Sequence, residues 1–220
     1  MTHEDVNQLS DSRLELRKRI LSVAREAFMR HGIKSVTMDE IANLLSISKR
    51  TLYEVFRDKE TLLIECIRCN QEEFRQFIAE VDRKSDNVLE VILKFYKRTL
   101  EIYHDTNKRY YEDLCKYPKL KALMHDTQIR ESERRIQFFQ KGKEQGIFRD
   151  DVNLEIVNEL VKAQVDLLIN TEICELFSFE EVYESIIFTY IRGVCTEKGQ
   201  RILENFVNEH KKQEEQKSGK

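Results

Sequence analysis

Residues that can hold nucleic acid gather in one short stretch of the chain. Lys49, Arg50 and Thr51 come directly after Ser48, and Tyr53 follows two positions later. Lysine and arginine pair with phosphate or with guanine, and threonine can touch a thymine methyl group. A tyrosine hydroxyl suits a phosphate oxygen. These residue types therefore predict contacts with both the backbone and the base edges of DNA.

Two short helices joined by a tight turn are predicted to position these side chains. Thr37 and Glu40 have the spacing of a capping box, which marks the start of the first helix. Ser48 is a suitable N-cap for the second helix. Leu52 and Phe56, four residues apart, fall on the face that would pack against neighbouring helices. A short helix packed from behind, with cationic and hydroxyl groups in front, is typical of a helix-turn-helix motif.

The same stretch resembles the N-terminal domain of TetR-family transcriptional regulators. One residue departs from the family's pattern, because Ser46 stands in the turn where the family usually has glycine. That position often needs a positive φ angle, which serine tolerates less well than glycine. The matching elements, in the family's order and spacing, are the RHG sequence at 30–32, Thr37, the pair 41–42, the segment 48–53, Phe56 and the segment 59–62.

The resemblance implies an all-α fold with two functional parts. These are an N-terminal three-helix helix-turn-helix DNA-binding domain and a C-terminal helical ligand-binding and dimerisation domain. The residue types add Lys49 and Arg50 as base-reading candidates, in positions that vary with the operator. The alternative is that these residues do not contact DNA. Thr37 and Ser48 would then be only helix caps, and Lys49 and Arg50 would form a solvated face. The resemblance implies DNA contacts at Thr37, Ser48, Thr51, Tyr53 and Lys59.

The composition also favours a helical protein. The chain has 1 Pro and 6 Gly among 220 residues, and so few turn residues predict few, long elements. The longest apolar runs, near 165–169 and 186–191, are too short to span a membrane. No secretion leader is visible, so we expect a cytoplasmic protein without a membrane partner. The net charge of -3 argues only weakly against nucleic acid, because a dimer doubles a modest basic patch.

The pattern divides the chain into consecutive parts. Residues 1–11 are predicted to be a flexible N-terminus, and residues 12–58 the helix-turn-helix domain. A connecting helix follows at 59–83, then the ligand-binding and dimerisation domain at 84–200. The last part, 201–220, is predicted as a helix with a charged tail. Apolar periodicity predicts body helices at about 87–103, 108–115, 119–145, 154–174 and 179–197.

The last two body helices, 154–174 and 179–197, are apolar on more than one face. A surface helix needs only one apolar stripe, so the surplus predicts a second buried face against another subunit. The resembling family builds a four-helix dimer bundle from these helices. The alternative is a central core helix within a monomer. The predicted interface residues are Val161, Val165, Leu168, Ile187, Tyr190, Ile191 and Val194.

The resemblance further implies a cavity for a small-molecule effector inside the body. An apolar pocket with a few polar groups suits an apolar or aromatic ligand. Aromatic side chains at helical spacing are also consistent with ordinary core packing, and that alternative stays open. The candidate lining residues are Phe95, Tyr96, Tyr103, Tyr110, Tyr111, Phe138, Phe139 and Gln164.

The remaining reactive residues do not predict catalysis. Five cysteines without an export signal indicate reduced thiols. Cys66 and Cys69 form a lone CxxC pair inside a predicted helix, which favours a structural role over a redox or zinc site. No nucleophile elbow, phosphate loop or paired histidine ligands appear. We therefore expect no enzyme, no metal and no cofactor.

Together these observations predict a homodimeric, ligand-responsive transcriptional regulator. It would bind a palindromic operator in double-stranded DNA and act as a repressor that a small molecule releases. The alternative is a helix-turn-helix protein without a small-molecule effector, which acts through a protein partner.

Overall fold

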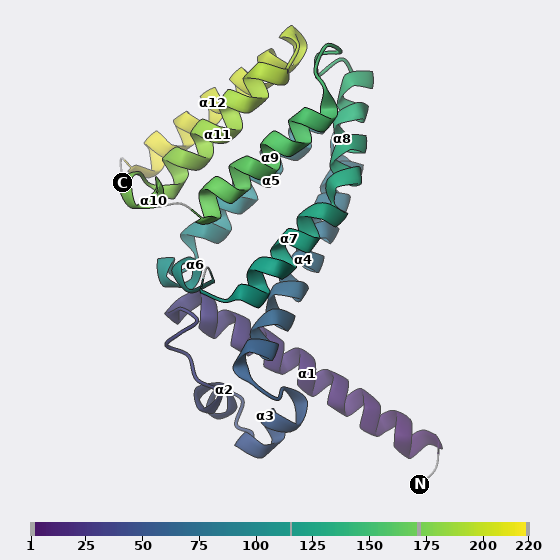
Figure 1. Cartoon of the computed structure of the whole chain (residues 1–220), viewed down its shortest axis with the longest axis vertical. Helices are drawn as coiled ribbons and strands as arrows, with labels where there is room; N and C mark the ends of the chain where they lie inside the picture. The colour runs from purple at the N-terminus through teal and green to yellow at the C-terminus, as the bar shows by residue number, and fades with distance from the viewer. Residues whose placement is uncertain (1–2, 115, 171–172, 219–220) are drawn as a thin grey trace. The chain divides into compact units, whose positions relative to one another are not determined.

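The computed structural model describes the backbone of residues 3–114, 116–170 and 173–218 (Figure 1). Side chains at 3–11, 121, 128, 165–166, 168–170, 174–175 and 210–218 lie outside the described part. The described backbone is helical apart from its connections and one isolated antiparallel bridge between Phe148 and Cys195. The all-α prediction is confirmed.

The helices are long where the chain lacks turn residues and short around the helix-turn-helix motif. In chain order they are α1 (His3–His31), α2 (Met38–Leu44), α3 (Lys49–Val55), α4 (Lys59–Lys84), α5 (Val88–His104), α6 (Lys108–Leu114), α7 (Pro118–Arg130), α8 (Ser132–Glu144), α9 (Leu154–Asn170), α10 (Ile173–Leu176), α11 (Phe179–Val194) and α12 (Glu197–Ser218).

Two compact units form the fold, and neither follows a single stretch of sequence. The first combines Met1–Phe77 with Ile102–Lys121, and the second combines Ile78–Glu101 with Ala122–Lys220. The short helix α6 therefore packs with the helix-turn-helix motif, although in sequence it lies between helices of the body. The predicted domain boundaries placed this segment in the body.

The core of the first unit joins α1, α2, α3 and α4. Leu52 and Phe56, expected to pack against neighbouring helices, are buried together with Phe28 and Ile41. Gly32 follows the last residue of α1 with φ +84, the left-handed conformation in which many helices end. This core fixes the helices that carry the candidate DNA-binding side chains.

The core of the second unit is rich in aromatic rings. Tyr96 of α5 is fully buried, and its ring centroid lies 4.9 Å from that of Phe188 and 5.6 Å from that of Tyr183. At the other end of α11, Cys195 closes the bridge to Phe148, whose ring fills the space beside Gly142.

Several helix boundaries differ from those predicted. α1 begins at His3 rather than near residue 12, and α12 begins at Glu197. The single helix predicted at 119–145 is wrong, because α7 and α8 are separate helices that meet at Glu131. Glu131 keeps a nearly helical backbone, with φ -83 and ψ -3, so apolar periodicity carries no signal of the interruption. The helix predicted at 154–174 is described as α9 up to Asn170 and as α10 from Ile173, and residues 171–172 lie outside the described part.

Candidate nucleic-acid interface

The turn between α2 and α3 closes through a left-handed residue. Ser46 has φ +54, and among the described residues it is the one non-glycine with a positive φ. Its N–H donates to the Asn43 carbonyl at 3.0 Å, and the Ile47 N–H donates to the Ala42 carbonyl at 3.0 Å. Serine thus takes the left-handed conformation here, at the position where the resembling family usually has glycine. Holding serine in this conformation costs about 1 kcal/mol.

Both helices of the motif begin with the predicted caps. The Thr37 N–H donates to the Glu40 carboxylate at 2.6 Å, and the Glu40 N–H donates to the Thr37 hydroxyl at 3.2 Å. The bond from the Thr37 N–H lowers the pKa of Glu40 below its ordinary value. At the next helix, the Thr51 N–H donates to the Ser48 hydroxyl at 3.0 Å. Thr37 and Ser48 are also exposed, so capping leaves both side chains accessible at the surface.

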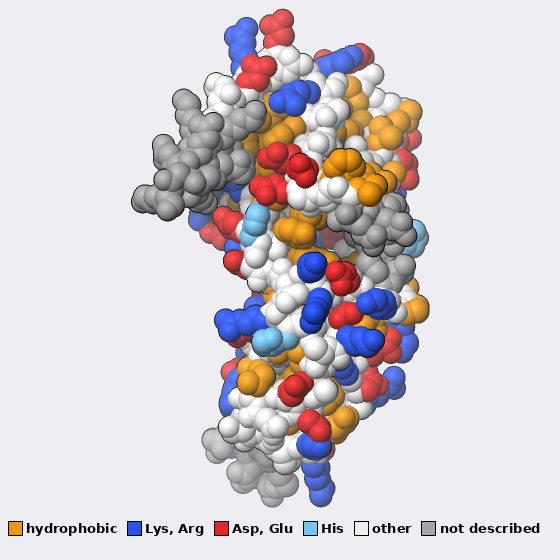
Figure 2. Space-filling model, turned by 90° about the vertical axis from the view of Figure 1, so that its left-hand side faces the viewer, with side chains coloured by type: hydrophobic (Ala, Val, Ile, Leu, Met, Phe, Trp, Pro, Cys, Tyr) orange, Lys and Arg blue, Asp and Glu red, His pale blue; other side chains and the backbone are white. Residues whose placement is uncertain are grey.

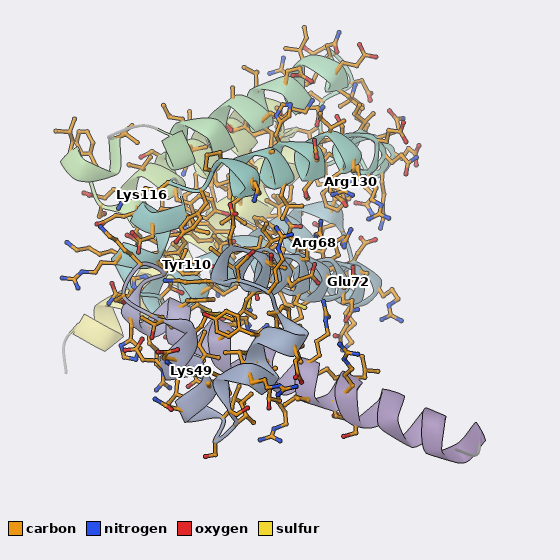
Figure 3. The ribbon with its side chains drawn as sticks, turned by 60° about the horizontal axis from the view of Figure 1, so that its bottom comes forward. Lys49, Arg68, Glu72, Tyr110, Lys116 and Arg130 are labelled. Carbon is orange, nitrogen blue, oxygen red and sulfur yellow. The ribbon has the colours of Figure 1, made fainter. Side chains whose placement is uncertain are left out.

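The cations at the start of α3 are exposed and held by acidic neighbours. Lys49, labelled in Figure 3, forms an ion pair with Asp39 of α2. Arg50 pairs with Glu54 at 2.9 Å. The Arg50 side chain is 88% exposed, and exposed pairs of this kind contribute little stability. A phosphate or a base edge can therefore replace the carboxylate partners at low cost.

The opposite face of α3 is anchored. Leu52 is fully buried and Phe56 nearly so. The guanidinium of Arg17 lies 5.3 Å from the centre of the Phe56 ring and pairs with Glu65 of α4 at 2.6 Å. Tyr53 is 48% exposed on the outer side of α3. The helix is thus fixed from behind, with its polar side open.

Lys59 begins α4 in a half-buried position. Asp58 caps this helix by accepting the Thr61 N–H at 2.7 Å. The Lys59 ammonium donates to the Lys34 carbonyl at 3.3 Å and lies 6.0 Å from the centre of the Phe28 ring. Burial lowers the pKa of Lys59. All the residues predicted to contact DNA lie in the first unit, on the cap of α2, on α3 with its cap, and at the start of α4.

No local signal in the sequence indicates that α6 supports this surface. The Asn107 side chain donates to the Arg30 carbonyl at 3.1 Å, and Asp113 accepts the Lys34 N–H at 2.7 Å. Asparagine before a helix signals an N-cap, but it does not reveal a partner 77 residues away. Figure 2 shows cationic and acidic side chains mixed over the visible face, as the net charge of -3 suggests.

The predicted effector residues are divided between the two units. Tyr103, Tyr110 and Tyr111 lie in the first unit, where Tyr103 stacks on Tyr111 with ring centroids 5.4 Å apart. The others lie in the second unit, where the Tyr96 hydroxyl donates to Glu184 at 2.5 Å. Tyr96 is therefore a packed and hydrogen-bonded core residue. The lining of an effector cavity by Phe95, Phe138, Phe139 and Gln164 stays a prediction.

An open apolar groove lies between α9 and α11 on the second unit. Its volume is about 440 Å³, and Val157, Leu160, Tyr190 and Gly193 are among the lining residues. Ile156 on its edge is 59% exposed and Leu160 is 50% exposed. This outward stripe of α9 leaves large aliphatic side chains in contact with solvent.

The predicted dimer residues occupy different environments in one chain. Ile191 and Val194 are already buried in the chain's own core. Val161, Ile187 and Tyr190 are partly buried, and the side chains of Val165 and Leu168 lie outside the described part. Ile156 and Leu160 are among the large apolar side chains of the described part that remain exposed.

The CxxC pair has the environment of a structural site. Cys66 is buried and its thiol donates to the Leu21 carbonyl at 3.7 Å. Burial raises the pKa of Cys66 to about 12, which disfavours the reactive thiolate. Among the described residues, no three metal-ligand side chains are grouped to hold an ion. Of the helices in the described part, none is long and apolar enough to cross a membrane.

Comparison with known proteins matches the helix-turn-helix region. Residues 20–66 match the model of bacterial regulatory proteins of the tetR family. The chain is 32% identical over 84 residues to the uncharacterised HTH-type transcriptional regulator YhgD of Bacillus subtilis. It is 33% identical over 63 residues to the HTH-type transcriptional regulator QacR of Staphylococcus aureus. These segments cover 38% and 29% of this chain, and only 40% and 34% of the two relatives.

The likeness in fold extends over most of the chain. The transcriptional regulator of the TetR family from Cytophaga hutchinsonii superposes with a TM-score of 0.66 at 14% identity. The match covers 84% of this chain and 98% of that one. The capped motif and the match over residues 20–66 lead to one assignment: this region is similar to the helix-turn-helix domain of tetR-family bacterial regulatory proteins, and most of the chain shares the fold of a solved TetR-family structure.

Proposed function

We propose that this protein is a homodimeric, sequence-specific operator-binding repressor that a small molecule releases. The observation that carries the proposal is the geometry of α3. The helix is capped by Ser48, anchored by buried Leu52, and exposes cationic and phenolic side chains on its other face. A recognition helix in the major groove needs this combination of a fixed back and a polar front.

The candidate residues divide into two roles. Thr37, Ser48, Tyr53 and Lys59 would contact phosphates, because they lie at helix N-termini or carry a hydroxyl or ammonium at the surface. Lys49, Arg50 and Thr51 would contact base edges from the first turn of α3.

Dimerisation would use the groove and stripe of α9 and α11. Large exposed aliphatic side chains beside an apolar groove support an interface with a second copy. A dimer presents two recognition helices to half-sites about 34 Å apart, which predicts a palindromic operator.

Ligand release would follow from a population shift. A small molecule that prefers a conformation with the wrong spacing of recognition helices lowers operator affinity by that preference. The aromatic residues of the second unit favour an apolar or aromatic ligand. A small molecule that shifts the melting temperature of the protein and also releases it from DNA would support this mechanism of release. Intact operator binding without any such ligand would favour the protein-partner alternative.

Selection of genomic DNA fragments by the purified protein tests the proposal. We expect an enriched palindrome. Tyr53→Phe should weaken binding to all sequences, whereas Arg50→Ala should relax the preference at particular bases. Arg134→Ala on α8 is a matched control, because Arg134 is also an exposed arginine in an intrahelical ion pair. Binding that neither variant alters, with the control likewise silent, would show that α3 is not the recognition helix.

A further inference from the structure

The connection between α1 and α2 is held by hydrogen bonds from the segment around α6. The Asn107 N–H donates to the Met29 carbonyl at 2.8 Å, and its side-chain amide donates to the Arg30 carbonyl at 3.1 Å. Asp113 accepts the Lys34 N–H at 2.7 Å. All of these residues belong to the first unit. The segment from Met29 to Lys34 is therefore fixed by residues outside the family-matching region 20–66.

Both backbone polar groups of Lys34, its N–H and its carbonyl, are hydrogen-bonded to side chains. Its N–H donates to Asp113 of α6, and its carbonyl accepts the Lys59 ammonium of α4 at 3.3 Å. The α2 cap, Thr37, follows three positions later. Asp113, Lys34 and Lys59 thus form one hydrogen-bonded chain that ends at a candidate phosphate-binding lysine.

The Asp113 carboxylate is placed for this role rather than for contact with solvent. Asp113 is 6% exposed, and its second oxygen accepts Lys116 at 3.1 Å. A Cβ added at Gly32 would lie 3.5 Å from the carboxylate and only 2.9 Å from the Arg109 Cβ, so glycine permits the close approach of α6. Burial opposes ionisation, but the bonds from Lys34 and Lys116 hold the pKa of Asp113 below its ordinary value.

We propose that Asp113 is a positioning residue for operator binding, which acts through the Lys34 peptide to place Lys59 against a DNA phosphate. The inference rests on the proposed phosphate contact of Lys59. Asp113 itself does not touch DNA. Without its carboxylate, the Lys34 N–H loses a buried acceptor, and the Lys34 peptide that holds Lys59 is released.

The test is a salt titration of operator binding by Asp113→Ala and Asp113→Asn. We expect Asp113→Ala to bind about tenfold more weakly to every sequence. Its slope of log affinity against log salt should be shallower by about one, which is the loss of one phosphate contact. The amide introduced by Asp113→Asn would keep a carbonyl oxygen for the Lys34 N–H, so this variant should stay within about twofold of the wild type.

Two further variants separate positioning from general damage. Lys116→Met removes the exposed partner of Asp113 but leaves the Lys34 bond, so affinity and slope should not change. Lys59→Met should reproduce the shallower slope, and adding Asp113→Ala to it should have no further effect. If Asp113 only stabilised the fold, Asp113→Ala would lower the melting temperature, but its slope of log affinity against log salt would not match that of Lys59→Met.

A misfolded Asp113→Ala would not end the test. Asp113→Glu keeps the charge but displaces the carboxylate, so we expect it to bind more weakly than Asp113→Asn. An unchanged slope in Asp113→Ala, additive effects with Lys59→Met, or tighter binding by Asp113→Glu than by Asp113→Asn would overturn the inference alone. A wild-type protein that selects no palindrome would overturn the proposed function as well.

Discussion

At the scale of single residues, the DNA-binding motif depends on backbone geometry more than on side-chain identity. Ser46 takes a left-handed turn at φ +54 that glycine takes without strain. Thr37 and Ser48 satisfy N–H groups that would otherwise lack partners. The motif therefore tolerates a strained turn because both flanking helices are capped.

Ser46→Gly should stabilise the protein by about 0.5–1 kcal/mol, because the left-handed strain disappears while part of the gain is lost to unfolded-state entropy. Urea unfolding measures the change. Ser48→Gly is the matched control at φ -70, where a cap is lost and stability should fall by a few tenths of a kcal/mol. A destabilised Ser46→Gly would show that the serine side chain contributes more than its backbone strain costs.

Stability should fall in acid through three carboxylates of the first unit. The Thr37 and Thr61 N–H groups lower the pKa of Glu40 and Asp58. Burial would raise the pKa of Asp113, but the Lys34 N–H and the Lys116 ammonium together outweigh it. A lowered folded pKa stabilises the fold above the unfolded values, 4.5 for Glu40 and 3.8 for the two aspartates. That stabilisation is lost as pH falls through the folded values.

Urea midpoints at about pH 7 and about pH 3 measure this loss. Asp113→Asn should have a smaller difference between the two midpoints than the wild type, because one titrating group is gone. A variant with the same or a larger acid loss would show that Asp113 is not among the groups responsible.

At the scale of elements, α3 is held by the middle of α1, and α6 is held at the end of α1 and the connection that follows it. α3 is anchored through Phe56 and Arg17, and α6 is anchored through Asn107 and Asp113. The close approach of α6 needs a residue without a side chain at the end of α1, which Gly32 provides. Packing at this point couples two segments that are far apart in sequence.

Gly32→Ala should destabilise the first unit by about 2–3 kcal/mol, since it combines a left-handed backbone with a clash against Arg109. Gly146→Ala is the control, because its φ is +67 but nothing lies within 4 Å of the added methyl group. It should cost only the backbone strain of about 1 kcal/mol. Thermal unfolding compares the two variants. Equal losses would mean that α6 moves away without cost.

At the scale of the whole molecule, α9 and α11 carry apolar side chains in two environments, some buried within the chain and some exposed to solvent. Ile191 and Val194 are buried within one chain, whereas Ile156 and Leu160 are not. The apolar residues of α9 and α11 therefore form two groups: one packs inside the chain, and the other faces solvent.

Ile156→Glu combined with Leu160→Glu should give a folded monomer, because charges cannot be buried unpaired at the centre of an interface. Sedimentation measures the oligomeric state, and operator affinity should fall with it. Ile129→Glu on α7 is the control, as Ile129 is an equally exposed aliphatic residue. A dimeric double variant would place the interface elsewhere.

Local signals in the sequence alone determined the helix-turn-helix motif, the caps at Thr37 and Ser48 and the all-α class. These features depend on residues a few positions apart, so they can be predicted from the linear sequence. Only the tertiary structure decided that Asp113 holds Lys34, that α7 and α8 are separate, and which apolar residues of α9 and α11 are already buried. Those outcomes depend on contacts between segments that are distant in sequence. Such segments compete for the same apolar faces and polar groups, and no local sequence pattern shows which contacts form in the folded chain.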